Sequence, residues 1–127
     1  MFVKNGWYAA GWSQDLGEKP VGRTLLGEKV VLFRGADGRA GALEDRCCHR
    51  AAPLSIGEVV GNDLMCGYHG LRFAADGRCT DIPGQTEIPA RANIRSYRLV
   101  ERWNVLWIWM GDPAKADPEK IEELPWL

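Results

Sequence analysis

Two short cysteine-histidine pairs, Cys47-x-His49 and Cys66-x-x-His69, impose the strongest constraint on how this chain can fold. Sixteen residues separate the pairs, and these two histidines are the only ones among the 127 residues. Cysteine and histidine are ligands that zinc and iron prefer. The sequence therefore predicts a metal centre, and a fold that brings the two pairs together.

Composition narrows the class of protein and its partners. A chain of 127 residues suits one domain with a core of its own. Its 16 Lys and Arg residues against 17 Asp and Glu residues give no basic surface of the kind that nucleic-acid binding requires. The sequence shows neither a signal peptide nor an apolar run of the roughly 20 residues that span a bilayer. We expect a cytoplasmic protein with no nucleic-acid or membrane partner, whose cysteines bind metal or stay reduced.

Strand-like segments separated by turn residues recur along the chain and predict an all-β fold. Asp37-Gly38 and Asp76-Gly77 each lie between two such segments and predict hairpin turns. Every residue from 105 to 110 is apolar, so both faces of this strand should be covered, with Trp107 and Trp109 in the core. Only residues 113–123 have short helical possibilities. The expected strands are Gly6 to Trp12, Val21 to Leu26, Val30 to Arg34, Ala40 to Asp45, Leu64 to Met65, Leu71 to Phe73, Tyr97 to Glu101 and Val105 to Met110.

The four ligand candidates match a [2Fe-2S] cluster in which two thiolates bind one iron and two imidazoles bind the other. On this interpretation Cys47 and Cys66 share one iron, and His49 and His69 share the second. Zinc accepts the same donor atoms, but structural zinc sites usually carry a Cys-x2-4-Cys pair followed by a histidine pair. A zinc-bound interaction module is the alternative from a different class.

The chain resembles the N-terminal Rieske domain of Rieske non-haem iron oxygenases, and most closely the vanillate O-demethylase and phenoxybenzoate dioxygenase group. The resemblance implies an antiparallel Rieske-type fold with a small cluster-binding subdomain of two loops and one [2Fe-2S] cluster per chain, with Cys47, His49, Cys66 and His69 as ligands. It implies a Rieske domain at residues 1–112, with cluster-binding loops at about 45–85, and a connector at 113–127. Ile82-Pro83-Gly84 corresponds to a third loop that shields the cluster. The resemblance is carried by Arg46-Cys47-Cys48-His49-Arg50-Ala51-Ala52-Pro53-Leu54, by Cys66-Gly67-Tyr68-His69-Gly70-Leu71, and by residues 76–79, 82–85, 107–113 and 125–127.

The same resemblance implies one-electron transfer. Such a domain takes electrons from a reductase or ferredoxin and passes them to an oxygenase catalytic domain through an exposed N–H of His49 or His69. The catalytic iron of these enzymes needs two histidines and a carboxylate, and both histidines here are assigned to the cluster. We therefore expect no catalytic residue and no turnover of an aromatic substrate by this chain alone, and an isolated domain that is monomeric. A stand-alone Rieske ferredoxin is the alternative, which the oxygenase-like residues 111–127 disfavour.

Respiratory Rieske proteins resemble this site but carry a disulfide between the loops and a serine after the second histidine. Ala52, Tyr68 and Leu71 occupy those places here. Fewer hydrogen bonds to cluster sulfur predict a negative midpoint potential, at the low end of the Rieske range. The potential should fall as pH rises through the pKa values of the ligand histidines. The remaining thiols, Cys48 and Cys79, are predicted to be buried and unreactive.

Overall fold

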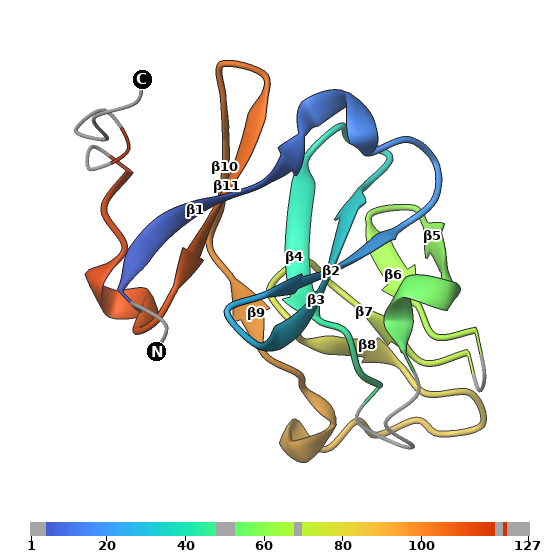
Figure 1. Cartoon of the computed structure of the whole chain (residues 1–127). Helices are drawn as coiled ribbons and strands as arrows, with labels where there is room; N and C mark the ends of the chain where they lie inside the picture. The colour runs from blue at the N-terminus through green and yellow to red at the C-terminus, as the bar shows by residue number, and fades with distance from the viewer. Residues whose placement is uncertain (1–4, 48–52, 68–69, 119–120, 122–127) are drawn as a thin grey trace.

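The computed structural model describes residues 5–47, 53–67, 70–118 and 121. Within these ranges eleven strands form three antiparallel sheets (Figure 1), which confirms the predicted all-β class. The only helices in the described ranges are short 3-10 turns, and none is long and apolar enough to cross a membrane. These turns are η1 (Ser13–Asp15), η2 (Leu54–Ile56), η3 (Ala90–Ala92) and η4 (Pro113–Lys115).

Each sheet has a simple strand order. The first sheet is β1-β11-β10, with β1 (Gly6–Trp12), β11 (Val105–Met110) and β10 (Leu99–Arg102). The second is β2-β3-β4-β9, with β2 (Val21–Leu25), β3 (Glu28–Arg34), β4 (Ala40–Glu44) and β9 (Ser96–Tyr97). The third is β5-β6-β7-β8, with β5 (Glu58–Val60), β6 (Asp63–Met65), β7 (Arg72–Phe73) and β8 (Cys79–Asp81).

The second sheet lies between two cores because β3 buries both of its faces. Successive side chains of a strand point to opposite faces. Val30 and Leu32 pack into a core with side chains of the first sheet. Val31 and Phe33 pack into a second core with side chains of the third sheet and of the loops at its end. The chain is therefore layered, and β3 is the wall that the two cores share.

The first sheet is also covered on both sides, as the apolar pattern of β11 predicts. Its tryptophans, Trp107 and Trp109, are buried on the outer face of the sheet, together with Trp7 and Ile121. The indole N–H of Trp109 donates to the carbonyl of Asp112 at 2.7 Å. The C-terminal segment therefore packs against this sheet as far as Ile121, while the domain boundary at residue 112 stays a prediction.

Both Asp-Gly hairpins are confirmed, and their turns share one construction. Asp37-Gly38 connects β3 to β4, and Asp76-Gly77 connects β7 to β8. Only the glycines have positive φ, 87° and 88°. Each aspartate instead accepts a hydrogen bond from the backbone N–H two residues later, that of Arg39 or Arg78, at 2.9 Å. The aspartate fixes the turn through its carboxylate, while glycine supplies the left-handed backbone.

Some strand predictions were incomplete. The expected strand from Tyr97 to Glu101 is two strands, because the chain passes at Arg98 from the second sheet to the first. Strands β5 and β8, of three residues each, were not predicted. Strand β3 begins at Glu28 rather than at Val30, because positive φ at Leu26 and Gly27 forms a tight turn directly before it.

Candidate metal centre

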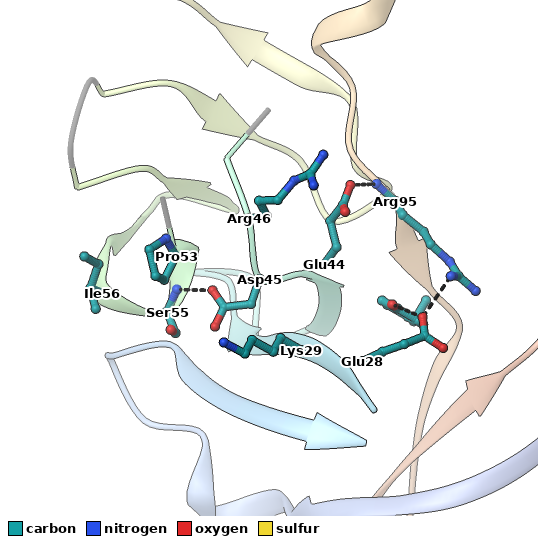
Figure 2. A pocket seen from close by; sticks show the side chains of 10 residues that line it. Glu28, Lys29, Glu44, Asp45, Arg46, Pro53, Ser55, Ile56 and Arg95 are labelled. Atoms are coloured by element: carbon teal, nitrogen blue, oxygen red, sulfur yellow. Dashed lines mark hydrogen bonds and ion pairs between the residues drawn. The ribbon is translucent and has the colours of Figure 1, made fainter. Parts of the chain in front are cut away.

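The first predicted ligand loop leaves the end of β4 and is closed at its base by a side chain. Asp45 Oδ1 accepts a hydrogen bond from the backbone N–H of Ser55 at 2.7 Å, seen in Figure 2. This bond joins the residue two places before Cys47 to the 3-10 turn η2, on the far side of the loop. The ends of the loop are therefore held together by a contact within the protein itself.

The second predicted ligand loop is a tight turn that follows β6. The N–H of Cys66 donates to the carbonyl of Leu71 at 2.7 Å, and the carbonyl of Cys66 accepts from the N–H of Gly70 at 3.0 Å. Gly70 has a φ of 75°, a conformation that glycine adopts without steric cost. Cys66 is thus fixed by its own backbone at the mouth of the turn.

The two loops meet through glycines. A Cβ atom built on Gly57 would lie 2.0 Å from the carbonyl oxygen of Met65, and one built on Gly67 would lie 3.5 Å from the Cα of Gly57. Any side chain at Gly57 would therefore collide with the backbone that leads into Cys66. This close approach brings η2, which ends the first loop, against the start of the second loop.

A third segment lies beside the second loop. Pro83 and Gly84 form a turn in which the N–H of Gln85 donates to the carbonyl of Ile82 at 3.0 Å. The Cγ atom of Pro83 lies 3.4 Å from the Cβ position of Gly70. This segment therefore covers one side of the second loop, where the resemblance places a shielding loop.

Cys47 and Cys66 lie in one buried core. Each is 1% exposed, and both belong to the core between the second and third sheets. The neighbours are apolar, among them Phe33, Leu54 and Leu71, and no charged side chain of the described residues is buried. A thiolate in such surroundings needs a cation to compensate its charge.

These surroundings fit the implied cofactor. Two thiolates and two neutral imidazoles leave an oxidised [2Fe-2S] core with about zero net charge, which an apolar pocket tolerates better than a net charge of about minus two from four thiolates. His49 and His69 lie outside the described residues, as do Cys48, Ala52 and Tyr68. The structure therefore brings the two predicted cysteine ligands into one core and does not place the histidines.

Cys79 shares this core without being a predicted ligand. It is buried, its N–H donates to Asn93 Oδ1 at 2.9 Å, and its Sγ lies 3.7 Å from the carbonyl oxygen of Asp81. The prediction that this thiol is buried is confirmed, and its low reactivity stays a prediction. Sequence reasoning missed the contributions of Asp45 and Gly57, for which the only signal was a turn-forming residue near each end of the first loop.

Comparison with known proteins identifies the family to which the chain belongs. The Rieske [2Fe-2S] domain family matches residues 6–98. A putative toluene-4-sulfonate monooxygenase system iron-sulfur subunit of Comamonas testosteroni is 56% identical over 99% of this chain and 36% of its own length. The vanillate O-demethylase oxygenase subunit of Pseudomonas sp. strain HR199 is 44% identical over 99% of this chain and 35% of its own length.

Solved structures agree with this result. A crystal structure of dicamba monooxygenase superposes with a TM-score of 0.91 and 49% identity, covering 94% of this chain and 38% of that one. The chain thus spans little more than a third of the length of the relatives it matches. The resemblance to the vanillate O-demethylase group is confirmed by these matches along nearly the whole chain. With its three antiparallel sheets and two cysteine-bearing loops, the chain belongs to the Rieske [2Fe-2S] domain family, whose members bind a [2Fe-2S] cluster.

Proposed function

We propose that Cys47, His49, Cys66 and His69 hold the cluster, and that the chain transfers single electrons as the Rieske part of an oxygenase or O-demethylase component. The observation that carries this proposal is the burial of both cysteines in one apolar core, at the mouths of two loops that touch through Gly57. When bound, the cluster supplies a site that accepts and releases one electron.

The protein's own residues have distinct tasks in this function. The apolar side chains around Cys47 and Cys66 exclude water from the sulfur atoms. The backbone turn from Cys66 to Leu71 and the Asp45 to Ser55 hydrogen bond hold the two loops in place. We assign to His49 and His69 the exit of electrons, because a metal-bound imidazole retains a second ring nitrogen that can face an acceptor.

We further propose that substrate chemistry takes place on residues outside this chain. A mononuclear iron of the oxygenase type needs two histidines and a carboxylate. These 127 residues contain no histidine beyond the two assigned to the cluster. The relatives, named as oxygenase subunits and components, are almost three times as long as the matched stretch. The electron acceptor is then the catalytic domain of such a component, and the donor is a reductase or ferredoxin.

Ligand replacement tests the proposed function. The purified protein should contain iron and sulfide in equal amounts and give a Rieske EPR spectrum after reduction. Cys47→Ser and Cys66→Ser should each abolish the spectrum, because serine does not replace a thiolate in this ligand set. Cys79→Ser is the matched control, since this cysteine is buried in the same core and is not a proposed ligand. Stoichiometric zinc without iron, or a spectrum that survives Cys47→Ser, would refute the assignment.

A further inference from the structure

An open hollow of about 640 Å³ lies beside the first cluster loop (Figure 2). Its walls are the first residues of β3, the last residue of β4 and the two that follow it, the turn from Pro53 to Ile56, and the segment from Arg95 to Tyr97. Three acidic and three basic residues line it, so their formal charges balance. The acidic residues, however, are more buried than the basic ones.

The acidic side chains of the hollow lie inward and are engaged by the protein. Glu28 Oε1 accepts hydrogen bonds from the guanidinium of Arg95 and from the hydroxyl of Tyr97, both at 2.9 Å. Glu44 Oε1 accepts from the backbone N–H of Arg95 at 2.8 Å. Asp45, the third, closes the base of the cluster loop. All three carboxylates are partly buried, and each accepts at least one hydrogen bond from within the protein.

The basic side chains form the outer rim. Lys29, Arg46 and Arg95 are all exposed. Neither Lys29 nor Arg46 forms an ion pair with any residue that the structure describes. A protein that approaches this hollow therefore meets positive charge first, and two of these cations are available to pair with its carboxylates.

An apolar side chain stands at the edge of the basic rim. Ile56 is 70% exposed, and it also borders a second hollow of about 960 Å³. Protein-protein interfaces combine apolar contacts with charged and polar ones. The surface formed by Lys29, Arg46, Arg95 and Ile56, called here the basic surface, offers both kinds of contact.

The basic surface lies next to Cys47 along the chain and next to Cys66 in space. Arg46 directly precedes Cys47. Ile56 directly precedes Gly57, which contacts the backbone on either side of Cys66. A partner that binds Arg46 would therefore contact the neighbour of Cys47. A partner that covers Ile56 would contact the neighbour of Gly57, which packs against the backbone around Cys66.

We propose that the basic surface is the docking site of an acidic electron-donor protein, and that electrons enter the cluster from its cysteine side. The inference rests on the proposed electron-transfer function and adds to it the entry face and the chemistry of the donor. The donor surface carries carboxylates that pair with Lys29 and Arg46 and an apolar patch that covers Ile56. If electrons enter on the cysteine side of the cluster, the histidine side stays available for the electron acceptor.

Stopped-flow reduction of the cluster-loaded protein tests this proposal. The probe is a photoreduced plant-type [2Fe-2S] ferredoxin, chosen because its surface is acidic and its potential lies below the Rieske range. Lys29→Glu and Arg46→Glu should each lower the second-order rate constant at low ionic strength by about tenfold, since charge complementarity steers association. Added salt should slow the reduction of the wild-type protein and have much less effect on the variants.

Arg39→Glu provides the matched charge reversal. Arg39 is 90% exposed at the tip of the β3-β4 hairpin, at the opposite end of these strands from Lys29. Ferredoxin should reduce the Arg39→Glu variant at the wild-type rate. Equal rates for Lys29→Glu, Arg46→Glu and Arg39→Glu would overturn the docking site. So would sedimentation showing that the wild-type protein is a dimer and that Lys29→Glu and Arg46→Glu are monomers, because the basic surface would then join two copies of the chain.

Different results would refute the proposed function and the docking site. A wild-type protein that shows no Rieske spectrum after reduction by dithionite refutes the proposed function, and the docking site with it. A protein that dithionite reduces normally, but whose reduction by ferredoxin ignores both charge reversals and salt, refutes the docking site alone.

Discussion

Gly57 sets how closely the two cluster loops approach each other. Its φ of −82° is open to any residue, so backbone conformation does not require glycine there. The requirement comes from the carbonyl oxygen of Met65, which occupies the space of a side chain. Since that carbonyl belongs to the residue before Cys66, a side chain at Gly57 would displace a proposed ligand.

Gly57→Ala should therefore impair cluster binding and stability together. We expect less iron per chain and a loss of about 1–3 kcal/mol in the free energy of unfolding, the usual cost of overpacking. Iron analysis and chemical denaturation measure the two effects. Gly17→Ala is the control, because no atom lies within 4 Å of its Cβ position. Full iron content and wild-type stability in Gly57→Ala would contradict this role.

The apolar side chain of Leu71 bears on the reduction potential. It is buried in the core that contains both cysteines, where the resemblance places a serine in respiratory Rieske proteins. We expect a negative midpoint potential for the wild-type protein, and a higher one for Leu71→Ser, because a hydroxyl donor stabilises the reduced cluster. Voltammetry measures both. A wild-type value above about +100 mV would contradict the prediction, since it lies well up the Rieske range.

At the scale of elements, one ion pair ties the first sheet to the second. Arg34 at the end of β3 donates to both carboxylate oxygens of Glu101 on β10, at 2.8 and 2.9 Å. The same guanidinium also donates to the carbonyls of Ser13 and Gly38. Arg34 thus connects β3 to β10 and to η1, which lie far from it in the sequence, and to the hairpin turn that follows β3.

This pair should make stability depend on pH in the acid range. The hydrogen bonds from Arg34 lower the pKa of Glu101 from its usual value of 4.5. The contribution is therefore fully present above 4.5 and is lost as pH falls through the lowered pKa of the folded state. Because both groups are partly exposed, Glu101→Gln should cost only about 1 kcal/mol at pH 7.

Urea denaturation at pH 7 and pH 3 checks this dependence. The difference in stability between wild type and Glu101→Gln should shrink at the lower pH. Glu18→Gln, at an exposed position in the loop before β2, serves as the control. A difference that stays constant between the two pH values would argue against the ion pair as its source.

At the scale of the whole molecule, the C-terminal segment is packed as part of the first layer. Trp7 donates its indole N–H to the carbonyl of Asp117 at 2.8 Å, and Arg102 donates to the carbonyl of Pro118 at 3.1 Å. Ile121 is fully buried among the tryptophans. The outer face of β11 is therefore sealed by residues that follow it in sequence.

Ile121→Ala should loosen the packing of the C-terminal segment against the tryptophans of the first sheet and expose them to water. Deleting a fully buried isoleucine side chain to alanine costs about 2–5 kcal/mol, and the tryptophan emission should shift to longer wavelength as water reaches the indoles. Denaturation followed by fluorescence measures both effects. Ile56→Ala, at an exposed position, should change the stability by less than about 0.5 kcal/mol. Equal stability losses in the two variants would refute the seal.

Much of this architecture was predictable from local sequence. The alternation in β11, the two Asp-Gly turns and the two cysteine-histidine pairs each depend on neighbouring residues, and they led to the all-β fold and the cluster family. The contacts between distant segments were not predictable. Gly57 against Met65 and Arg34 against Glu101 depend on how the sheets stack, and Arg98 shows no local sign that the chain changes sheets there.

Strand β3 separates the core that contains Cys47 and Cys66 from the core between the first and second sheets. The core between the first and second sheets, and the tryptophan face beyond it, contain neither of the proposed cysteine ligands. Packing in two of the three apolar cores therefore requires no contact with a proposed cysteine ligand. We therefore expect a protein that has lost its iron to keep these two cores folded and to remain able to take up a new cluster.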